Sequence, residues 1–191
     1  MNEQIQPRWE VSPPDRDRLQ HLPLRRIGAQ TSLKAAITSP AILGVLTHFM
    51  GGRTLACIQG DCPGCTAKLP QRWEGYLGVW TTKPCKHIIL AVTPGAALGI
   101  GDTAPDPVNL RGLYLTVERL GRRANSRLQA RVEEVELGQI KLPEIPDLKA
   151  HLLHIWGLDQ AHLGTDNPDY AAEVLRTYGR HTKSTDEDST Q

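Results

Sequence analysis

One histidine and three cysteines stand close together in the sequence, with the spacing H-x8-C-x4-C-x2-C. A tetrahedral zinc ion needs four nitrogen or sulfur donors, and the CPGC segment supplies two thiolates from one tight turn. The first two donors flank the sequence GGRT, whose glycines suit a strand-to-strand turn that brings both ends of a hairpin together. We therefore predict a zinc site, which requires a fold that brings its four ligands together. The predicted ligands are His48, Cys57, Cys62 and Cys65.

A fourth cysteine leaves a second ligand set open. Cys85 could replace His48 and give a site of four thiolates, which is equally good zinc chemistry. We prefer His48, because Cys85 is then an ordinary buried thiol at the end of a strand. Four protein ligands leave no open coordination position, so the predicted site is structural and contributes folding free energy on the order of 10 kcal/mol.

Catalytic uses of the same cysteines fit the sequence less well. A thioredoxin-type CPGC should open a helix, but Pro70 ends any helix soon after it. A zinc deaminase needs H-x-E, whereas His48 is followed by Phe49 and Met50. The chain also lacks a Walker loop, GxSxG and GxGxxG. We therefore expect a protein that is not an enzyme.

Composition limits the class of protein further. The 191 residues carry 22 Lys and Arg against 21 Asp and Glu, a net charge of +1, which excludes a uniformly basic nucleic-acid-binding chain. No apolar run reaches the length of a membrane span, and the first residues do not resemble a secretory signal. We expect a cytoplasmic protein without a membrane partner, in which cysteines serve as metal ligands rather than disulfides.

The chain divides by its patterning into four parts. Short β-rich segments separated by Gly, Pro and Asn predict a mainly β domain, followed by amphipathic helices. Strands are expected at 41–49, 53–58, 75–82, 86–93, 110–120 and 127–137, a helical turn at 94–101, and helices at 143–157 and 167–179. The predicted parts are an extended arm (1–30), an OB-like domain (31–140) with a zinc loop (48–65), C-terminal helices (141–180) and a disordered acidic tail (181–191).

Charges are distributed unevenly along the chain. Residues 111–131 carry a net charge of +5 and residues 48–87 carry +3, whereas residues 159–191 carry −4. The near-neutral total therefore hides a basic β domain, and a basic surface on a β domain favours phosphate binding.

Aromatic residues accompany this basic region. Tyr76 and Trp80 share one face of the strand at 75–82 and flank Gly78, which leaves a flat gap suited to stacked bases. The alternative is that these rings pack in the core and that the arginines form a solvated face. The residues predicted to contact nucleic acid are Arg53, Arg72, Tyr76, Trp80, Lys86, Tyr114, Arg119, Arg122, Arg123, Arg127 and Arg131.

The order of one His and three Cys within a small β domain resembles the T4-type phage single-stranded-DNA-binding proteins, whose OB-fold carries a zinc subdomain with these ligand types in this order. Residues 110–132 look like the late hairpin of an OB barrel, and the DEDS stretch is similar to the acidic tails that recruit replication partners. The resemblance implies a five-stranded OB-like barrel with a zinc loop after its first strand, two C-terminal helices, and binding of single-stranded DNA in replication, recombination or a mobile element.

Two other functions stay open at this point. The chain could be a zinc-stapled protein-interaction subunit of a larger complex, which would expose an apolar patch around Leu152, Trp156 and Leu175. Alternatively, a redox or metal-dependent enzyme would need a reactive thiol or a zinc-bound water. The choice between DNA and RNA, the oligomeric state and the biological pathway also stay open.

Overall fold

The computed structural model describes residues 21–58, 62–135 and 141–158. In these residues the chain is mainly β, as predicted, with one eight-stranded sheet. The strands are β1 (Leu24–Arg25), β2 (Ser32–Ile37), β3 (Leu43–Met50), β4 (Arg53–Ala56), β5 (Arg72–Thr82), β6 (Cys85–Val92), β7 (Tyr114–Arg119) and β8 (Leu128–Glu133). The helices are α1 (Pro63–Thr66), α2 (Pro94–Thr103) and α3 (Leu148–Trp156).

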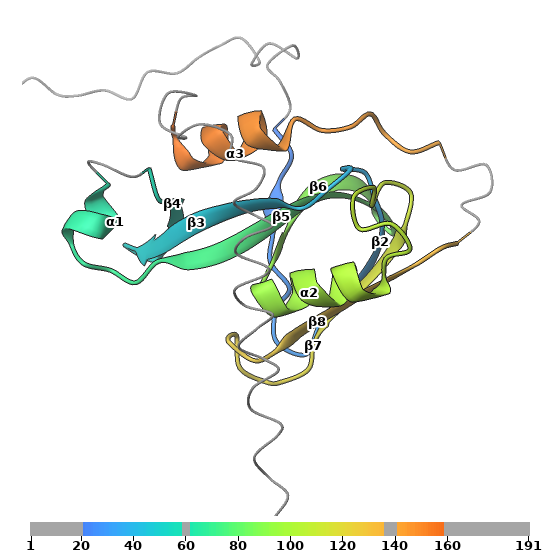
Figure 1. The fold of residues 1–191 in the computed structure, drawn as a ribbon, viewed down its shortest axis with the longest axis horizontal. Coiled ribbons are helices and arrows are strands. Elements are labelled where there is room, and N and C mark those ends of the chain that lie inside the picture. Colours follow the sequence, from blue (N-terminus) through green and yellow to red (C-terminus); the bar gives the residue numbers. More distant parts are fainter. Residues whose placement is uncertain (1–20, 59–61, 136–140, 159–191) are drawn as a thin grey trace, which may run out of the picture.

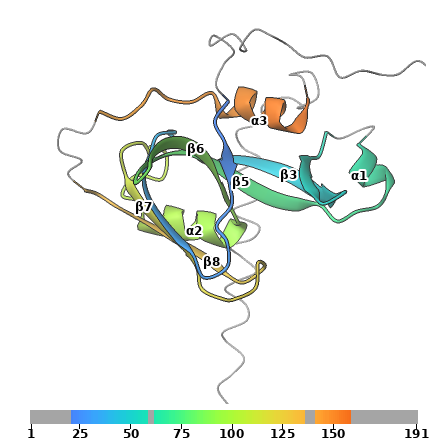
Figure 2. The same cartoon turned by 180° about the vertical axis from the view of Figure 1, so that it is seen from behind.

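The sheet is strongly curled but open (Figures 1 and 2). Its main path runs β1-β6-β5-β2-β7-β8, and only the β1–β6 pairing is parallel. The eleven-residue strand β5 pairs with β6 along one edge, and its other edge is shared between β3 and β2. The predicted barrel closure is not confirmed, because β6 has β1 as its second neighbour while the edge of β8 meets α2. There the Val132 N–H donates to Thr103 Oγ1 at 2.9 Å.

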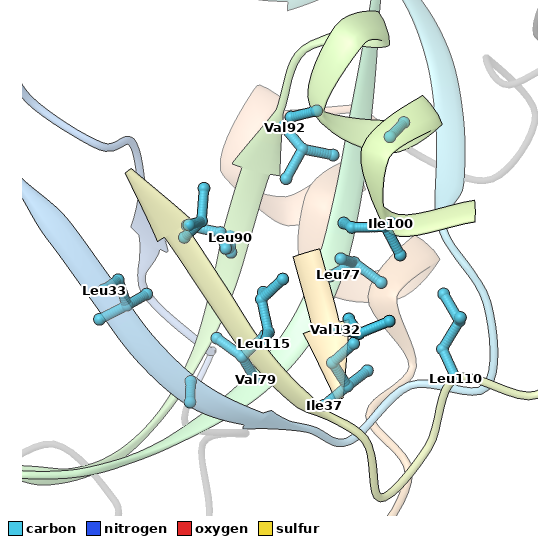
Figure 3. Packing of buried hydrophobic residues seen from close by; sticks show 14 of the residues in the cluster. Leu33, Ile37, Leu77, Val79, Leu90, Val92, Ile100, Leu110, Leu115 and Val132 are labelled. Carbon is cyan, nitrogen blue, oxygen red and sulfur yellow. The ribbon is translucent and has the colours of Figure 1, made fainter. Parts of the chain in front are cut away.

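The inner face of the curled sheet holds the main hydrophobic core (Figure 3). Side chains from five strands and α2 meet there, and many have no exposed surface. Burial of a large aliphatic side chain contributes about 1.5–3 kcal/mol, so this cluster is the main source of stability. Its members with the least exposure include Ile37, Leu77, Val79, Leu90, Ile100, Leu115 and Val117.

The hairpin β7–β8 confirms the alternation seen in the sequence. Leu115 and Val117 are fully buried, whereas Glu118 on the same strand is exposed. Leu128 and Val132 on β8 point into the same core. Period-two patterning predicts such a hairpin well, because successive side chains of a strand point to opposite faces.

Three elements were not predicted in this form. β2 pairs with both β5 and β7, yet its small alanines give little strand signal. β1 lies within the predicted arm, and Ile27, two residues after this strand, is buried in the core. α2 is a ten-residue helix rather than a short turn. Thr93 accepts a hydrogen bond from the Ala96 N–H as its N-cap, and Gly99 allows close contact with β8.

Helix α3 confirms the first of the two predicted C-terminal helices and lies over β5 and β6 (Figure 1). Asp147 caps its N-terminus by accepting from the Ala150 N–H, and Gly157 ends it with a φ of 67°. The second predicted helix (167–179) and the acidic tail (181–191) lie outside the described residues. In the described part of the chain, no helix combines the length and the apolar character needed to cross a membrane.

Candidate metal centre

The hairpin β3–β4 and the short helix α1 bring the four predicted ligands together. Gly51 and Gly52 form the tight turn of the hairpin with φ values of 58° and 77°, which glycine adopts without strain. His48 lies on β3 opposite Leu55, and the Cys57 N–H donates to the Leu46 carbonyl at 2.7 Å. Cys62 and Cys65 come from the first turn of α1, so the expected CPGC turn is a single helical turn.

The donor atoms of the four side chains converge. One ligand atom from each of the residues lies within 4.8 Å of every other. Cys65 Sγ is 3.5 Å from Cys57 Sγ and 3.4 Å from His48 Nε2. Three sulfurs and one imidazole nitrogen at such separations could hold a metal ion such as zinc. Among the described residues, no other group of three or more His, Cys, Asp or Glu side chains has such an arrangement.

A second layer of contacts orients the donors. His48 Nδ1 donates to the Leu69 carbonyl at 3.1 Å, which leaves the lone pair of Nε2 facing the sulfurs. Gln71 Nε2 donates to Cys57 Sγ at 3.2 Å and lies 3.5 Å from Cys65 Sγ. Gly64 is required beside the ring, because a Cβ there would overlap the His48 imidazole. The sequence spacing contained no signal for Leu69 or Gln71.

The thiols differ in their tendency to ionise. Burial raises the pKa of Cys62, but nearby N–H groups, first those of Cys65 and Ile58, outweigh it and lower that pKa to about 7. The hydrogen bond that the Cys65 thiol donates to Cys57, followed by burial, raises the pKa of Cys65 to about 11. Cys62 is therefore the thiol most ready to offer a thiolate to a metal, because thiolates and not thiols are the ligands.

Cys85 does not belong to this cluster. Its thiol donates to the Thr82 carbonyl at 3.3 Å, and its side chain is exposed at the start of β6. The cluster that could hold a metal therefore contains His48 and not Cys85. The expectation that Cys85 is a buried thiol is wrong, because the turn between β5 and β6 carries it into solvent.

The predicted stacking surface on β5 is covered. Tyr76 has no exposed surface, because Trp156 packs edge-on against it with ring centroids 5.7 Å apart. A Cβ at Gly78 would lie 2.6 Å from Pro146, so that residue fills the expected gap. The prediction that Tyr76 lies on an open face is wrong, since α3 and its preceding segment bury that face. Trp80 is half-buried beside His87.

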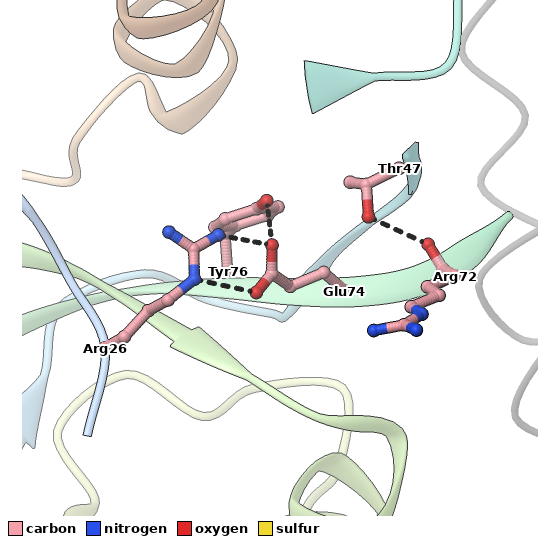
Figure 4. Close-up of polar contacts among 5 residues, drawn as sticks. All are labelled: Arg26, Thr47, Arg72, Glu74 and Tyr76. Carbon is pink, nitrogen blue, oxygen red and sulfur yellow. Dashed lines mark hydrogen bonds and ion pairs between the residues drawn. The ribbon is translucent and has the colours of Figure 1, made fainter. Parts of the chain in front are cut away.

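Polar contacts explain why Tyr76 fits this buried position (Figure 4). Its hydroxyl donates to Glu74 at 2.6 Å, and Arg26 pairs with the same carboxylate at 2.7 and 3.2 Å. Burial and the adjacent Glu74 carboxylate raise the pKa of Tyr76 well above its ordinary value. The phenol is therefore a neutral donor to Glu74, and the ion pair between Glu74 and Arg26 links β5 to the N-terminal segment.

The predicted basic residues divide into exposed and engaged groups. Arg119 is engaged, because its guanidinium donates to the carbonyls of Ile27 at 2.8 Å and of Ser126. Tyr114 is half-buried on β7. The exposed members are Arg53, Arg72, Lys86, Arg122, Arg123, Arg127 and Arg131.

One exposed aromatic residue was not among the predicted contacts. Phe49 is 58% exposed on β3, next to the buried His48, and it is the only phenylalanine of the chain. Strand alternation could have found it, because a buried ligand at position 48 places position 49 on the opposite face. The apolar patch expected around Leu152 is not exposed, since Leu152 is 1% exposed and Trp156 is half-buried. Leu175 lies outside the described residues.

The chain was compared with protein families, curated proteins and solved structures. No family model matches it, and neither the curated proteins nor the solved structures give a match.

Proposed function

We propose that this chain is a non-enzymatic single-stranded nucleic-acid-binding protein with an OB-like domain and a structural zinc. The ion would be held by His48, Cys57, Cys62 and Cys65, whose four donors leave no coordination position for a substrate. In this role the zinc orders the β3–β4 hairpin and α1 and takes no part in chemistry. DNA is the preferred ligand.

The strand order supports the OB-like assignment. Counting β2, β5, β6, β7 and β8 as strands one to five, the sheet contains the spatial order 4-1-2-3 of a Greek key. OB-folds are partly open Greek-key barrels, and they bind oligonucleotides with strands two and three and with the loops joining strands one to two and four to five. The candidate metal ligands lie in the first of these connections, between β2 and β5. Residues 120–127 form the second connection, between β7 and β8.

The observation that carries the proposal is the charge of that second connection. Arg122, Arg123 and Arg127 are exposed in and beside the β7–β8 loop, and Arg131 follows on β8. Exposed guanidiniums attract phosphates without regard to base sequence. Phe49 and Arg53 are exposed on the hairpin of the metal centre, where a ring and a cation could contact one base and one phosphate.

The proposed interface differs from the predicted one in three residues, because it omits Tyr76 and Arg119 and adds Phe49. Tyr76 is covered and Arg119 holds backbone carbonyls, so neither is part of the proposed contact surface. The proposed surface consists of Phe49, Arg53, Arg72, Trp80, Lys86, Tyr114, Arg122, Arg123, Arg127 and Arg131.

Fluorescence anisotropy with a labelled single strand at several salt concentrations tests the proposal. We expect affinity to fall steeply with salt, and Arg122→Gln with Arg123→Gln to reduce the slope of log K against log salt by about 1.4, which is about 0.7 for each phosphate contact. The matched control removes two exposed cations elsewhere, with Arg25→Gln and Lys141→Gln.

Absence of binding by the zinc-loaded wild-type chain would contradict the proposal. An equal loss of salt dependence in the control would reject the β7–β8 loop as the contact. Comparing DNA and RNA strands of the same sequence decides which nucleic acid is bound, because the 2′-hydroxyl is the main difference available to the protein.

A further inference from the structure

Helix α3 and the segment before it cover the outer face of β5 and β6. Leu148 and Leu152 pack with Tyr76 and Ile89 in a small second core, separate from the main cluster. This covering element, residues 143–156, is called here the α3 cover. No residue of α3 belongs to the main core, so removal of the α3 cover would leave that core intact.

Three histidines meet where the α3 cover joins the N-terminal segment. His21 stacks on His154 with ring centroids 3.4 Å apart and ring planes 9° from parallel. The same ring meets His151 edge-on at 5.6 Å. The neighbouring Leu22 N–H donates to His151 Nδ1 at 3.4 Å, and His21 Nδ1 is buried without a hydrogen-bond partner. One imidazole from the N-terminal segment thus contacts two from consecutive turns of α3.

This arrangement does not suit several protonated rings at once. Neutral rings can stack as aromatic side chains do, whereas two imidazolium ions at 3.4 Å would repel each other strongly. A fully protonated His151 also has no lone pair on Nδ1, so it could not accept from Leu22. Protonation of all three rings therefore removes the stacking attraction and the hydrogen bond and introduces repulsion.

The charged groups around the cluster do not compensate for added protons. Asp147 on the same helix is the one acid that raises the pKa of His151. His87 on β6 faces His151, and Arg111 faces His87 while donating to the Thr38 and Pro143 carbonyls. Glu74 on β5 is already paired with Arg26 and with the Tyr76 hydroxyl.

We propose that His21, His151 and His154 form a proton-operated latch, which holds the α3 cover on the sheet while the rings are neutral and releases it on protonation. Release would expose Tyr76, Gly78 and the neighbouring apolar surface of β5 and β6. The latch rests on the ring contacts and on the hydrogen bond between Leu22 and His151, and it does not depend on nucleic-acid binding.

The direction of the pH effect follows from the folded-state pKa of His151. Burial, and next the charge of His21, lower that pKa below its ordinary value of 6.5. A histidine with a lowered pKa stabilises the folded contact fully above the ordinary value, and this contribution is lost as the pH falls below it. The cover should therefore be closed above about pH 6.5 and increasingly open in more acidic solution.

Amide hydrogen exchange on the full zinc-loaded chain tests the latch without any ligand. Protection factors, corrected for intrinsic exchange, should fall in α3 between about pH 7.5 and about pH 5.5, by up to about tenfold per pH unit for each proton taken up. Protection in β7, where Leu115 lies in the main core, should not follow this fall.

Substitutions assign the effect to the cluster. His154→Phe keeps a ring stacked on His21 but binds no proton, so the fall in α3 protection should become shallower. His21→Phe is a second variant with the same expectation, should the first fail to fold. His87→Gln removes a titratable group that is not part of the stack and retains a partner for Thr38, so it should keep a steeper fall than the two phenylalanine variants.

Two results would overturn the latch. The first is constant α3 protection in the wild-type chain across this pH range. The second is an equally steep fall in wild-type protein and in both phenylalanine variants. Acid loss of the metal affects all of these proteins equally, so it cannot produce a difference between them.

Discussion

The curled sheet and the metal module, residues 48–71, are held together in different ways. In the sheet, side chains such as Ile37, Leu77 and Leu115 have no exposed surface. In the metal module, Phe49 is 58% exposed and Cys65 is exposed, and the most buried side chains include His48 and Cys62. The sheet is thus stabilised by apolar burial, whereas the metal module has little apolar burial, so we expect it to depend on a metal bound by its donor atoms. The two regions should therefore fail under different perturbations.

Metal removal should separate the two regions most clearly. Structural zinc contributes apparent free energy on the order of 10 kcal/mol, and the metal module has few buried apolar groups to replace it. We expect a chelator to lower amide protection in β4 and α1 far more than in β7 and β8, which stay protected. Hydrogen exchange with and without chelator measures this difference, and uniform loss across the chain would break the comparison.

Single ligand variants sharpen the same test. Cys62→Ser should lose stoichiometric zinc, because it removes one of four converging donors. Cys85→Ser is the matched control and should retain it, because Cys85 is exposed outside the cluster. Elemental analysis of the purified proteins gives the result. Equal metal content in both variants, or purified wild-type chain without metal, would reject the proposed centre.

A core truncation should affect the sheet and spare the metal. Leu115→Ala should lower the free energy of unfolding by about 2–5 kcal/mol, because the residue is fully buried. Leu55→Ala, in the half-buried β4, should cost about 1 kcal/mol. Urea unfolding of the zinc-loaded proteins measures both values. A larger loss for Leu55 would show that the metal module also depends on apolar burial.

The outer contacts of the donors should have a smaller effect. Gln71→Leu removes the amide that donates to the Cys57 sulfur and should weaken zinc binding by about 10- to 100-fold. Gln129→Leu, at an exposed position of β8, should leave the affinity unchanged. Competition with a chromophoric chelator compares the two variants. Equal zinc affinities in the two variants would show that the Gln71 contact does not contribute to metal binding.

The smallest effect is expected from proton binding by the metal-free module. The lowered pKa of Cys62, about 7, means that its thiolate stabilises the folded form fully above the ordinary value of 9.0. This contribution falls as the pH drops and is lost below about 7. Thiolate absorbance of the metal-free Cys85→Ser protein should therefore show one ionisation near pH 7, and Cys62→Ser should remove it. A titration that begins only near 9.0 would contradict the lowered pKa.

Local spacing was sufficient to predict the metal cluster. His48 and Cys65 lie in one short stretch, and the glycine turn after Phe49 leaves few ways to arrange that stretch. The alternation of Leu115 and Val117 likewise predicted the β7–β8 hairpin, because strand geometry translates period two directly into two faces. Such features depend on neighbours along the chain.

The remaining elements depend on contacts between distant parts of the chain. The sequence pattern places Tyr76 on an open face of its strand, and the burial of this residue requires Trp156, which lies 80 residues later in the chain. The alanines of β2 form a strand because β5 and β7 flank it, and α2 forms despite its glycines because β8 packs against it. The open edge of the sheet also depends on where β1 and α2 lie.

The sequence by itself therefore determined the three cysteines of the metal cluster, the mainly β character and the arginine-bearing hairpin, since each follows from residues a few positions apart. Only the tertiary structure decided that α3 covers β5, that three histidines meet beside it, and that Cys85 stands apart from the metal. The physical reason is that a periodic pattern says which side of an element is apolar. It does not say which distant segment removes that side from water.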